Sequence, residues 1–226
     1  MRKFRNALLG LALAALAAVP FAAGRFDSAA RAQAQAARAS YAPVPAGEYK
    51  LDPAHSVIGF SIRHLEISWV EGRFKDFAGT IRYDDKDVTK SSVEFSAKVA
   101  SIDTGVEARD KHLRAADFFE VEKFPEMTFK STRVERQGGD KYVLHGDLTL
   151  KGVTKAVALP FTVTGAIKDP WGNTRFGVEA TTKINRRDFG VNYSRALEAG
   201  GLVVADEVTV NLHLEAVQPA PKPAGQ

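Results

Sequence analysis

Hydrophobic and polar side chains alternate along most of the chain between positions 47 and 218. A repeat of two residues predicts β-strands that bury one face and expose the other. The clearest hydrophobic stripes run through residues 57–64, 93–99, 142–150, 157–167, 176–184 and 208–214. The strands do not alternate with helical repeats, so the pattern disfavours a parallel α/β fold.

Short turn sequences separate the predicted strands. Residues 137–140 (Gln-Gly-Gly-Asp) and 151–155 are compact reversals, and residues 169–173 form a longer hairpin end. Gly165 lies inside a strand pattern, where glycine permits a bend or a bulge. Together these features predict a mainly β fold, either a sandwich or an antiparallel barrel, and closure into a barrel removes exposed sheet edges.

One polar segment interrupts the strands. Residues 107–114 (Glu-Ala-Arg-Asp-Lys-His-Leu-Arg) carry five charged side chains and a histidine. We predict a short helix here, with Asp103 or Thr104 as its start signal. A polar helix inserted into a strand-rich chain is a natural rim or lid for a barrel.

The inward faces of the predicted strands consist almost wholly of Val, Leu, Ile and Phe, with Gly and Ala between them. An eight-stranded barrel either fills such an interior with side chains or leaves room for one small apolar ligand. The alternation alone leaves both interpretations open.

The first 34 residues have the pattern of an export signal. Basic residues within the first five positions precede an uncharged run from Ala7 to Val19, and Pro20 follows it. The run is shorter than the ~20 residues that a membrane-spanning helix needs. We expect cleavage after Ala34 and a periplasmic or secreted location; an uncleaved N-terminal anchor is the alternative. Residues 35–46 then form a flexible segment leading into one domain at 47–218, and residues 219–226 form a disordered tail.

Removing the leader changes the charge of the protein. The whole chain has 31 basic and 27 acidic residues, a formal charge of +4. Residues 1–34 contain five of the basic residues and one of the acidic ones, which leaves 26 of each (31 less 5, 27 less 1). The remaining domain is neutral, so its charge gives no support for a nucleic-acid partner. The chain has no cysteine, which excludes disulfides, thiolate nucleophiles and Cys-ligated metals.

The five histidines show no spacing typical of a metal site. His145 and His213 share the outward phase of their strands, so we expect them at the surface. His64 ends a hydrophobic stripe, which places it at the barrel rim, either hydrogen-bonded there or in contact with a ligand. A charged group at residues 185–190 predicts an ion pair that fixes a turn.

Three interpretations are open for Arg109 to His112. A catalytic acid–base pair needs a carboxylate and an imidazole within hydrogen-bond reach, whereas adjacent helical residues point in different directions. The chain also lacks a Gly-x-Ser-x-Gly nucleophile motif. The segment is otherwise a capped, salt-bridged helix, or a cluster that holds the polar head group of a ligand with an apolar tail.

Several ordered motifs resemble the YceI-like family. They are LDPAHS (51–56), GRFKDFAG (72–79), SIDTG (101–105), RDKHL (109–113), FPEMTFKS (124–131) and RDFG (187–190). DPWG (169–172) is similar to the periplasmic members in particular. The resemblance covers the whole predicted domain.

The resemblance implies a lipocalin-like antiparallel β-barrel with a short helical insert, which holds an isoprenoid lipid or another long-chain amphiphile. It implies no enzymatic activity, no metal and no cofactor apart from the bound lipid. A C50-scale tail in water is unfavourable by ~0.8 kcal/mol per CH₂ group, so it must be covered to cross an aqueous compartment. We predict the head group near His55, His64, Arg109, Asp110 and His112. We predict the tail along Ile58, Phe60, Ile62, Val93, Phe95, Ala97, Val99, Phe161 and Val163.

The leading hypothesis is an exported carrier or store for an isoprenoid quinone or a polyprenyl phosphate. A lipid-modifying enzyme acting at the barrel mouth is one alternative, and a packed stress or interaction barrel without ligand is another. A homodimer and a transient membrane contact stay open as partners, and no nucleic acid is expected.

Overall fold

The fold is known from a computed structural model, which describes residues 41–198 and 200–220. The expected export signal, the first part of the flexible segment and most of the expected tail lie outside the described residues. Within the described residues, no helix is both long and apolar enough to cross a membrane.

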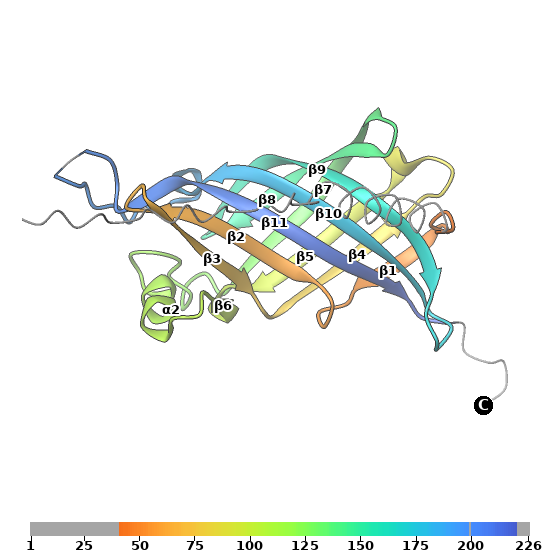
Figure 1. The fold of residues 1–226 in the computed structure, drawn as a ribbon, viewed down its shortest axis with the longest axis horizontal. Helices are drawn as coiled ribbons and strands as arrows, with labels where there is room; N and C mark the ends of the chain where they lie inside the picture. The colour runs from red at the N-terminus through yellow and green to blue at the C-terminus, as the bar shows by residue number, and fades with distance from the viewer. Residues whose placement is uncertain (1–40, 199, 221–226) are drawn as a thin grey trace, which may run out of the picture. The chain divides into compact units, whose positions relative to one another are not determined.

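Antiparallel pairing joins all the strands into one sheet. The order β1-β4-β5-β7-β8-β9-β10-β11 is closed by a further pairing between β1 and β11, which makes an eight-stranded barrel (Figure 1). The fold class predicted from the alternation and the resemblance is confirmed. The strands are β1 (Gly47–Leu51), β2 (Val57–His64), β3 (Ser68–Phe74), β4 (Phe77–Tyr83), β5 (Ser92–Lys98), β6 (Ile102–Asp103), β7 (Glu126–Gly138), β8 (Lys141–Leu150), β9 (Val153–Lys168), β10 (Thr174–Asn185) and β11 (Val204–Gln218).

Three of the barrel strands are bent, and each bend divides the strand into two labelled pieces. β2, β3 and β6 continue β1, β4 and β5 beyond these bends, because β2 pairs with both β11 and β3, and β3 pairs with β6. At one bend the hydroxyl of Ser101 accepts hydrogen bonds from the backbone N–H groups of Lys75 (3.1 Å) and Asp76 (3.0 Å). Backbone groups that lose their ladder partners at the bend are therefore paired with a side chain.

Gly165 forms the bulge that its position in the strand pattern predicted. Its φ of +83° suits glycine, and the register between β9 and β10 shifts between Phe176 and Val178. The extra residue reverses the side-chain phase, so Ala166 is buried (4% exposed) and Ile167 points outward (49% exposed). The expectation that Ile167 continues the inward stripe was wrong for this reason.

The two ends of the barrel differ. One end, called the helix end below, has the β2–β3 turn, α2 (Glu107–Arg114), the β8–β9 turn and residues 190–198 and 200–203 (Figure 1). The other, called the far end, has the start of β1, the β4–β5 connection with its 3-10 helix (Val88–Lys90), and the β7–β8 and β9–β10 turns. The predicted reversals at 137–140, 151–155 and 169–173 all join consecutive strands as expected.

The helix α2 starts at Glu107, later than expected, with Val106 at its N-cap and no side-chain cap. Asp103 and Thr104 shape the turn before it instead, because Asp103 accepts a hydrogen bond from the N–H of Gly105 (3.1 Å). Arg114, at the end of α2, donates to the carbonyls of Ala100 (2.8 Å) and Ile102 (3.0 Å). These bonds tie the helix to β6.

The ordered barrel begins before Gly47. Ala42 exchanges two backbone hydrogen bonds with Ala166 (3.1 and 2.8 Å), and Val44 is buried in the core at 5% exposure. The hydroxyl of Tyr49, itself fully buried, donates to the carbonyl of Pro45 (2.9 Å). The last part of the expected flexible segment is therefore packed against the barrel.

Candidate functional site

A cavity of about 460 Å³ lies inside the barrel. Its wall extends from Tyr83 and Val88, near the far end, to His64, Arg109 and His112 at the helix end. The barrel is therefore not filled by its own side chains, which removes the packed interior from consideration. A volume of this size is typical of pockets for small ligands.

The cavity wall is mainly aliphatic and aromatic. It includes seven of the nine residues predicted to contact a tail, namely Ile58, Phe60, Ile62, Val93, Phe95, Phe161 and Val163. β7, β8, β10 and β11 contribute further aliphatic and aromatic side chains. The role of these residues as ligand contacts stays a prediction.

Ala97 and Val99 do not line the cavity; both are 1% exposed and lie in the hydrophobic core. Val99 belongs to a 3-10 helix (Val99–Ser101) that follows β5, so the strand alternation no longer governs its direction. Ala97 is in register with Phe77 and Met127, and its methyl group is too short to reach past such neighbours. The alternation predicted that both side chains face the cavity, but the cavity-lining residues of this stripe end at Phe95.

The charged and imidazole side chains of the wall all lie at the helix end. They are Arg63, His64, Arg109, His112 and Arg186, and no carboxylate of the described residues lines the cavity. The cavity thus has one end rich in hydrogen-bond donors, while the remainder is mostly apolar. This polarity suits an elongated amphiphile with one polar end.

Arg109 is held in place by Thr104. Its Nε donates to the hydroxyl of Thr104 (2.7 Å) and one terminal nitrogen donates to the Thr104 carbonyl (2.7 Å). Asp110, which is 7% exposed, accepts hydrogen bonds from the N–H (2.9 Å) and the hydroxyl (2.5 Å) of the same threonine. Asp110 does not line the cavity and fixes the residue that orients Arg109, so its predicted place beside a head group stays a prediction.

His112 is oriented by one carboxylate and two aromatic rings. Its Nε2 lies 2.5 Å from a carboxylate oxygen of Asp117. The imidazole meets Phe118 (4.9 Å between ring centroids) and Tyr193 (5.1 Å) edge to face, and these two rings stack on each other at 4.6 Å. This contact joins α2 to residues 190–198. Tyr193 lines the cavity and was missed, since it lies in a connection without periodicity.

Two further arginines of the wall escaped prediction. Arg63 lies on the opposite phase from His64, and its guanidinium covers the ring of Trp69 at 4.3 Å. Arg186 is 5% exposed and donates to the carbonyls of Ala205, Val191 and Val204 and to Asp206 (3.0 Å). Burial lowers the pKa of Arg186, and the nearby Asp206 opposes that shift. The ion pairs of residues 185–190 are therefore made with Asp206 of β11, from Arg186 (3.0 Å) and from Nε of Arg187 (2.7 Å), and not within the turn as expected.

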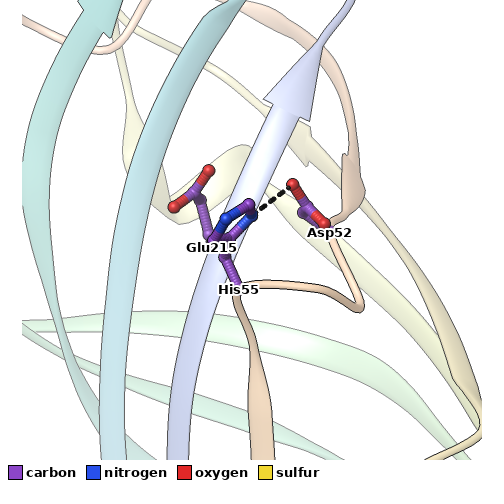
Figure 2. Close-up of side chains that lie close together, drawn as sticks. All are labelled: Asp52, His55 and Glu215. Atoms are coloured by element: carbon purple, nitrogen blue, oxygen red, sulfur yellow. Dashed lines mark hydrogen bonds and ion pairs between the residues drawn. The ribbon is translucent and has the colours of Figure 1, made fainter.

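His55 does not line the cavity and lies instead beside Asp52 and Glu215 (Figure 2), so its predicted place beside a head group stays a prediction that this cavity does not support. Its side chain is 63% exposed, and its Nδ1 lies 3.0 Å from Asp52. The bond to Asp52 raises the pKa of His55. Sequence position put His55 next to β2, but the bend between β1 and β2 turns it outward.

The comparisons with known proteins agree with this architecture. The family profile described as the YceI-like domain matches residues 49–216. The chain belongs to the YceI-like family. It is 49% identical to the UPF0312 protein plu2095 of Photorhabdus laumondii over 146 residues, which cover 64% of this chain and 76% of the relative.

Two solved structures have a similar fold. The Campylobacter jejuni YCEI protein is 33% identical with a TM-score of 0.61, covering 75% of this chain and 97% of that one. A polyisoprenoid binding domain from Saccharophagus degradans, implicated in plant cell wall breakdown, has a TM-score of 0.56 over 76% of this chain and 98% of its own. At 18% identity, the second likeness shows the fold alone.

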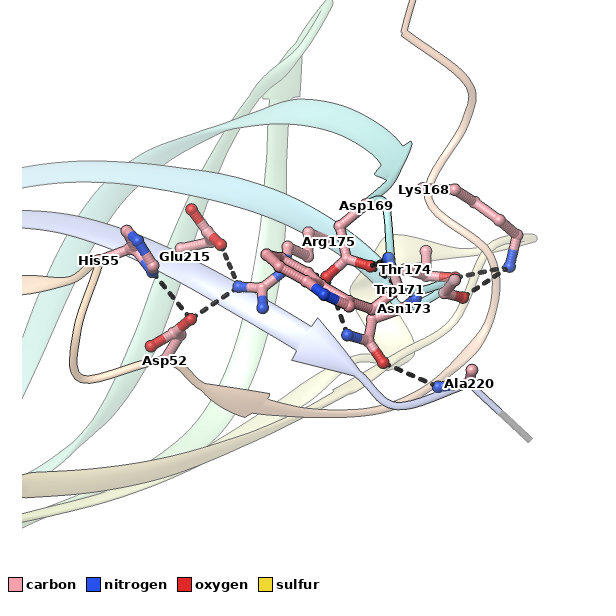
Figure 3. Close-up of polar contacts among 11 residues, drawn as sticks. Asp52, His55, Lys168, Asp169, Trp171, Asn173, Thr174, Arg175, Glu215 and Ala220 are labelled. Carbon is pink, nitrogen blue, oxygen red and sulfur yellow. Dashed lines mark hydrogen bonds and ion pairs between the residues drawn. The ribbon is translucent and has the colours of Figure 1, made fainter. Parts of the chain in front are cut away.

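One group of side chains in this YceI-like barrel has the composition of a metal site. Oxygen and nitrogen atoms of Asp52, His55 and Glu215 lie within 4.8 Å of one another. However, one terminal nitrogen of Arg175 contacts both carboxylates, at 2.6 Å from Asp52, and its Nε donates to Asp169 at 2.7 Å (Figure 3). The guanidinium already supplies the positive charge between the carboxylates, so this network fastens β10 to the bend between β1 and β2.

Proposed function

We propose that the protein is an exported carrier or store for an isoprenoid lipid, such as an isoprenoid quinone or a polyprenyl phosphate, and performs no covalent chemistry on it. The observation that carries this proposal is the mostly apolar cavity, whose cationic and imidazole side chains lie at one end only. An isoprenoid tail would lie along the wall, with its head group beside α2.

The hydrophobic effect supplies the affinity in this proposal. Each CH₂ equivalent that moves from water into the cavity contributes ~0.8 kcal/mol, so a tail of even ten buried carbons gains roughly 8 kcal/mol before the costs of binding. Tight binding therefore needs no large contribution from the head group. The polar end fixes the orientation of the ligand instead.

Arg109 is the residue best prepared to meet a head group. Thr104 occupies its Nε and one terminal nitrogen, and the guanidinium retains other N–H groups that can donate to a phosphate or carbonyl oxygen. His112 and His64 also line this end. Asp110 acts indirectly, because its carboxylate holds Thr104.

The family supports the proposal without deciding the ligand. The S. degradans protein of the same fold is named for polyisoprenoid binding. The export signal of residues 1–34 is read from the sequence, so the periplasmic or secreted location is part of the proposal. Dimerisation has no supporting observation and is not part of it.

Native mass spectrometry of the purified protein, with extraction and identification of bound lipid, tests the proposal. We expect a stoichiometric lipid in the wild type and a reduced amount in Ala180→Trp, because Ala180 lines the cavity and an indole would take up part of the space for the ligand. Ala158→Trp is the matched control, since Ala158 is exposed on β9. Absence of co-purified lipid, together with no saturable binding of quinone or polyprenyl phosphate, would refute the carrier.

The second candidate is a lipid-modifying enzyme, and the His112–Asp117 pair is the observation that favours it. A carboxylate that orients an imidazole at a cavity wall is the geometry of general acid–base catalysis. An enzyme requires lipid turnover that His112→Ala abolishes while ligand affinity is retained. A carrier shows no turnover in either protein.

A further inference from the structure

The turn between β2 and β3 exposes large apolar side chains. Ile67 is 79% exposed and Trp69 is 52% exposed. The turn itself is conformationally unfavourable, because Leu65 (φ 53°) and Glu66 (φ 61°) both adopt left-handed backbone without being glycine. Strain of this kind concentrates at functional sites.

Residues 65–69 of this turn, called the tip below, are hydrogen-bonded to residues at the rim of the cavity. The N–H of Leu65 donates to the carbonyl of Val203 (2.9 Å), and the N–H of Ile67 donates to the carbonyl of His64 (3.2 Å). His64 and Val203 both line the cavity. Whatever surface receives Ile67 therefore lies next to the polar end of the cavity.

The tip also carries a cation on an aromatic ring. Arg63 lies over Trp69 at 4.3 Å, and no carboxylate in the described part of the chain forms an ion pair with it. Tryptophan and arginine side chains favour the boundary between water and lipid, because each has an apolar part that can enter the lipid and a polar group that stays hydrated. Glu66 bears the opposite charge and is also exposed, so the contribution of Arg63 is a local contact with phosphate and not a net positive charge of the turn.

The far end of the barrel also exposes an isoleucine and a tryptophan, but these lie beside a group of carboxylates. Ile167 and Trp171 are 49% and 76% exposed there. The neighbouring network contains three carboxylates, those of Asp52, Asp169 and Glu215, around the guanidinium of Arg175, and the ammonium of Lys168 lies on the same hairpin (Figure 3). This acidic excess opposes contact with an anionic surface, whereas Arg63 favours it.

We propose that Ile67 and Trp69 insert into the surface of a phospholipid bilayer that contains anionic lipids, with Arg63 meeting lipid phosphates. This docking brings the rim of the cavity against the membrane, where an isoprenoid lipid can enter or leave without crossing water. The membrane contact depends only on the tip, while its purpose rests on the proposed carrier function.

Flotation with vesicles of phosphatidylethanolamine and phosphatidylglycerol tests the docking. The double variant Ile67→Ser/Trp69→Ser removes the tip, and Ile167→Ser/Trp171→Ser removes the same residue types from the far end. We expect the tip variant to lose at least about tenfold in partition coefficient, because two large apolar side chains no longer leave water. The far-end variant should stay within about twofold of the wild type.

The proposal is overturned if the wild type does not partition onto these vesicles, or if the far-end variant loses as much as the tip variant. A second assay, binding of a water-dispersed isoprenoid without vesicles, tests the carrier function separately from membrane docking. Neither variant should change this binding, since neither Ile67/Trp69 nor Ile167/Trp171 lines the cavity. Normal vesicle partition without isoprenoid binding would refute the carrier and leave the docking surface standing. Circular dichroism of both variants verifies that each is folded.

Discussion

Replacing Val99 by alanine is expected to destabilise the barrel more than the same replacement at Val93. Either change removes two methyl groups, worth ~1.6 kcal/mol at ~0.8 kcal/mol for each buried carbon, and a residual cavity adds to the loss where neighbours cannot relax. Val99 is 1% exposed in the packed core, so we expect ~2 kcal/mol. Val93 faces the existing cavity, and its truncation should cost less than ~1 kcal/mol.

Urea unfolding of lipid-free protein, followed by circular dichroism, measures both free energies. With a denaturant dependence of ~2 kcal/mol per molar, Val99→Ala should lower the midpoint by about 1 M and Val93→Ala by less than about 0.5 M. In the same proteins, binding of an apolar fluorescent probe should change only for Val93→Ala. Equal losses of stability would falsify the distinction between core and cavity wall, because they would mean that Val93 is packed as tightly as Val99.

Three further changes test separate parts of the barrel. The hydrogen bonds from His55 and Arg175 lower the pKa of Asp52 from 3.8 to about 2, so this carboxylate stabilises the fold above pH 3.8 and its contribution is lost as the pH falls toward 2. Arg175→Gln should weaken this acid dependence of the unfolding midpoint, and an unchanged dependence would contradict the assignment. Asp110→Ala should cost ~1–3 kcal/mol in urea unfolding, because it leaves the backbone N–H of Thr104 without its partner. Gly146→Ala should cost ~1–3 kcal/mol in the same assay, since a Cβ there would lie 2.4 Å from an aromatic ring atom and 2.6 Å from a backbone carbonyl oxygen; wild-type stability would refute that contact.

Much of the candidate cavity could be predicted because strand alternation is a local property. In β2, successive side chains point to opposite faces, so Ile58, Phe60 and Ile62 reach the interior once any barrel forms. The same reasoning placed His64 at the end of the stripe, where it lines the helix end. No information about distant segments was needed for these positions.

Interruptions of the strands limited the prediction. Gly165 signals a bulge, but only the pairing with β10 shows that the bulge turns Ile167 outward. Val99 continues the hydrophobic stripe in the sequence and yet begins a 3-10 helix. A local hydrophobic pattern does not state where the backbone leaves the sheet.

The sequence by itself determined the class of fold, the strands β2, β5, β8, β9, β10 and β11 and the apolar character of the interior, because these depend on short-range periodicity and on family motifs. Only the tertiary structure decided which polar residues meet. Arg175 contacts Asp52, 123 positions earlier, and draws His55 into an external network, while Tyr193 reaches His112 across the helix end. Such contacts are fixed by barrel closure and strand bends, which act over the whole chain.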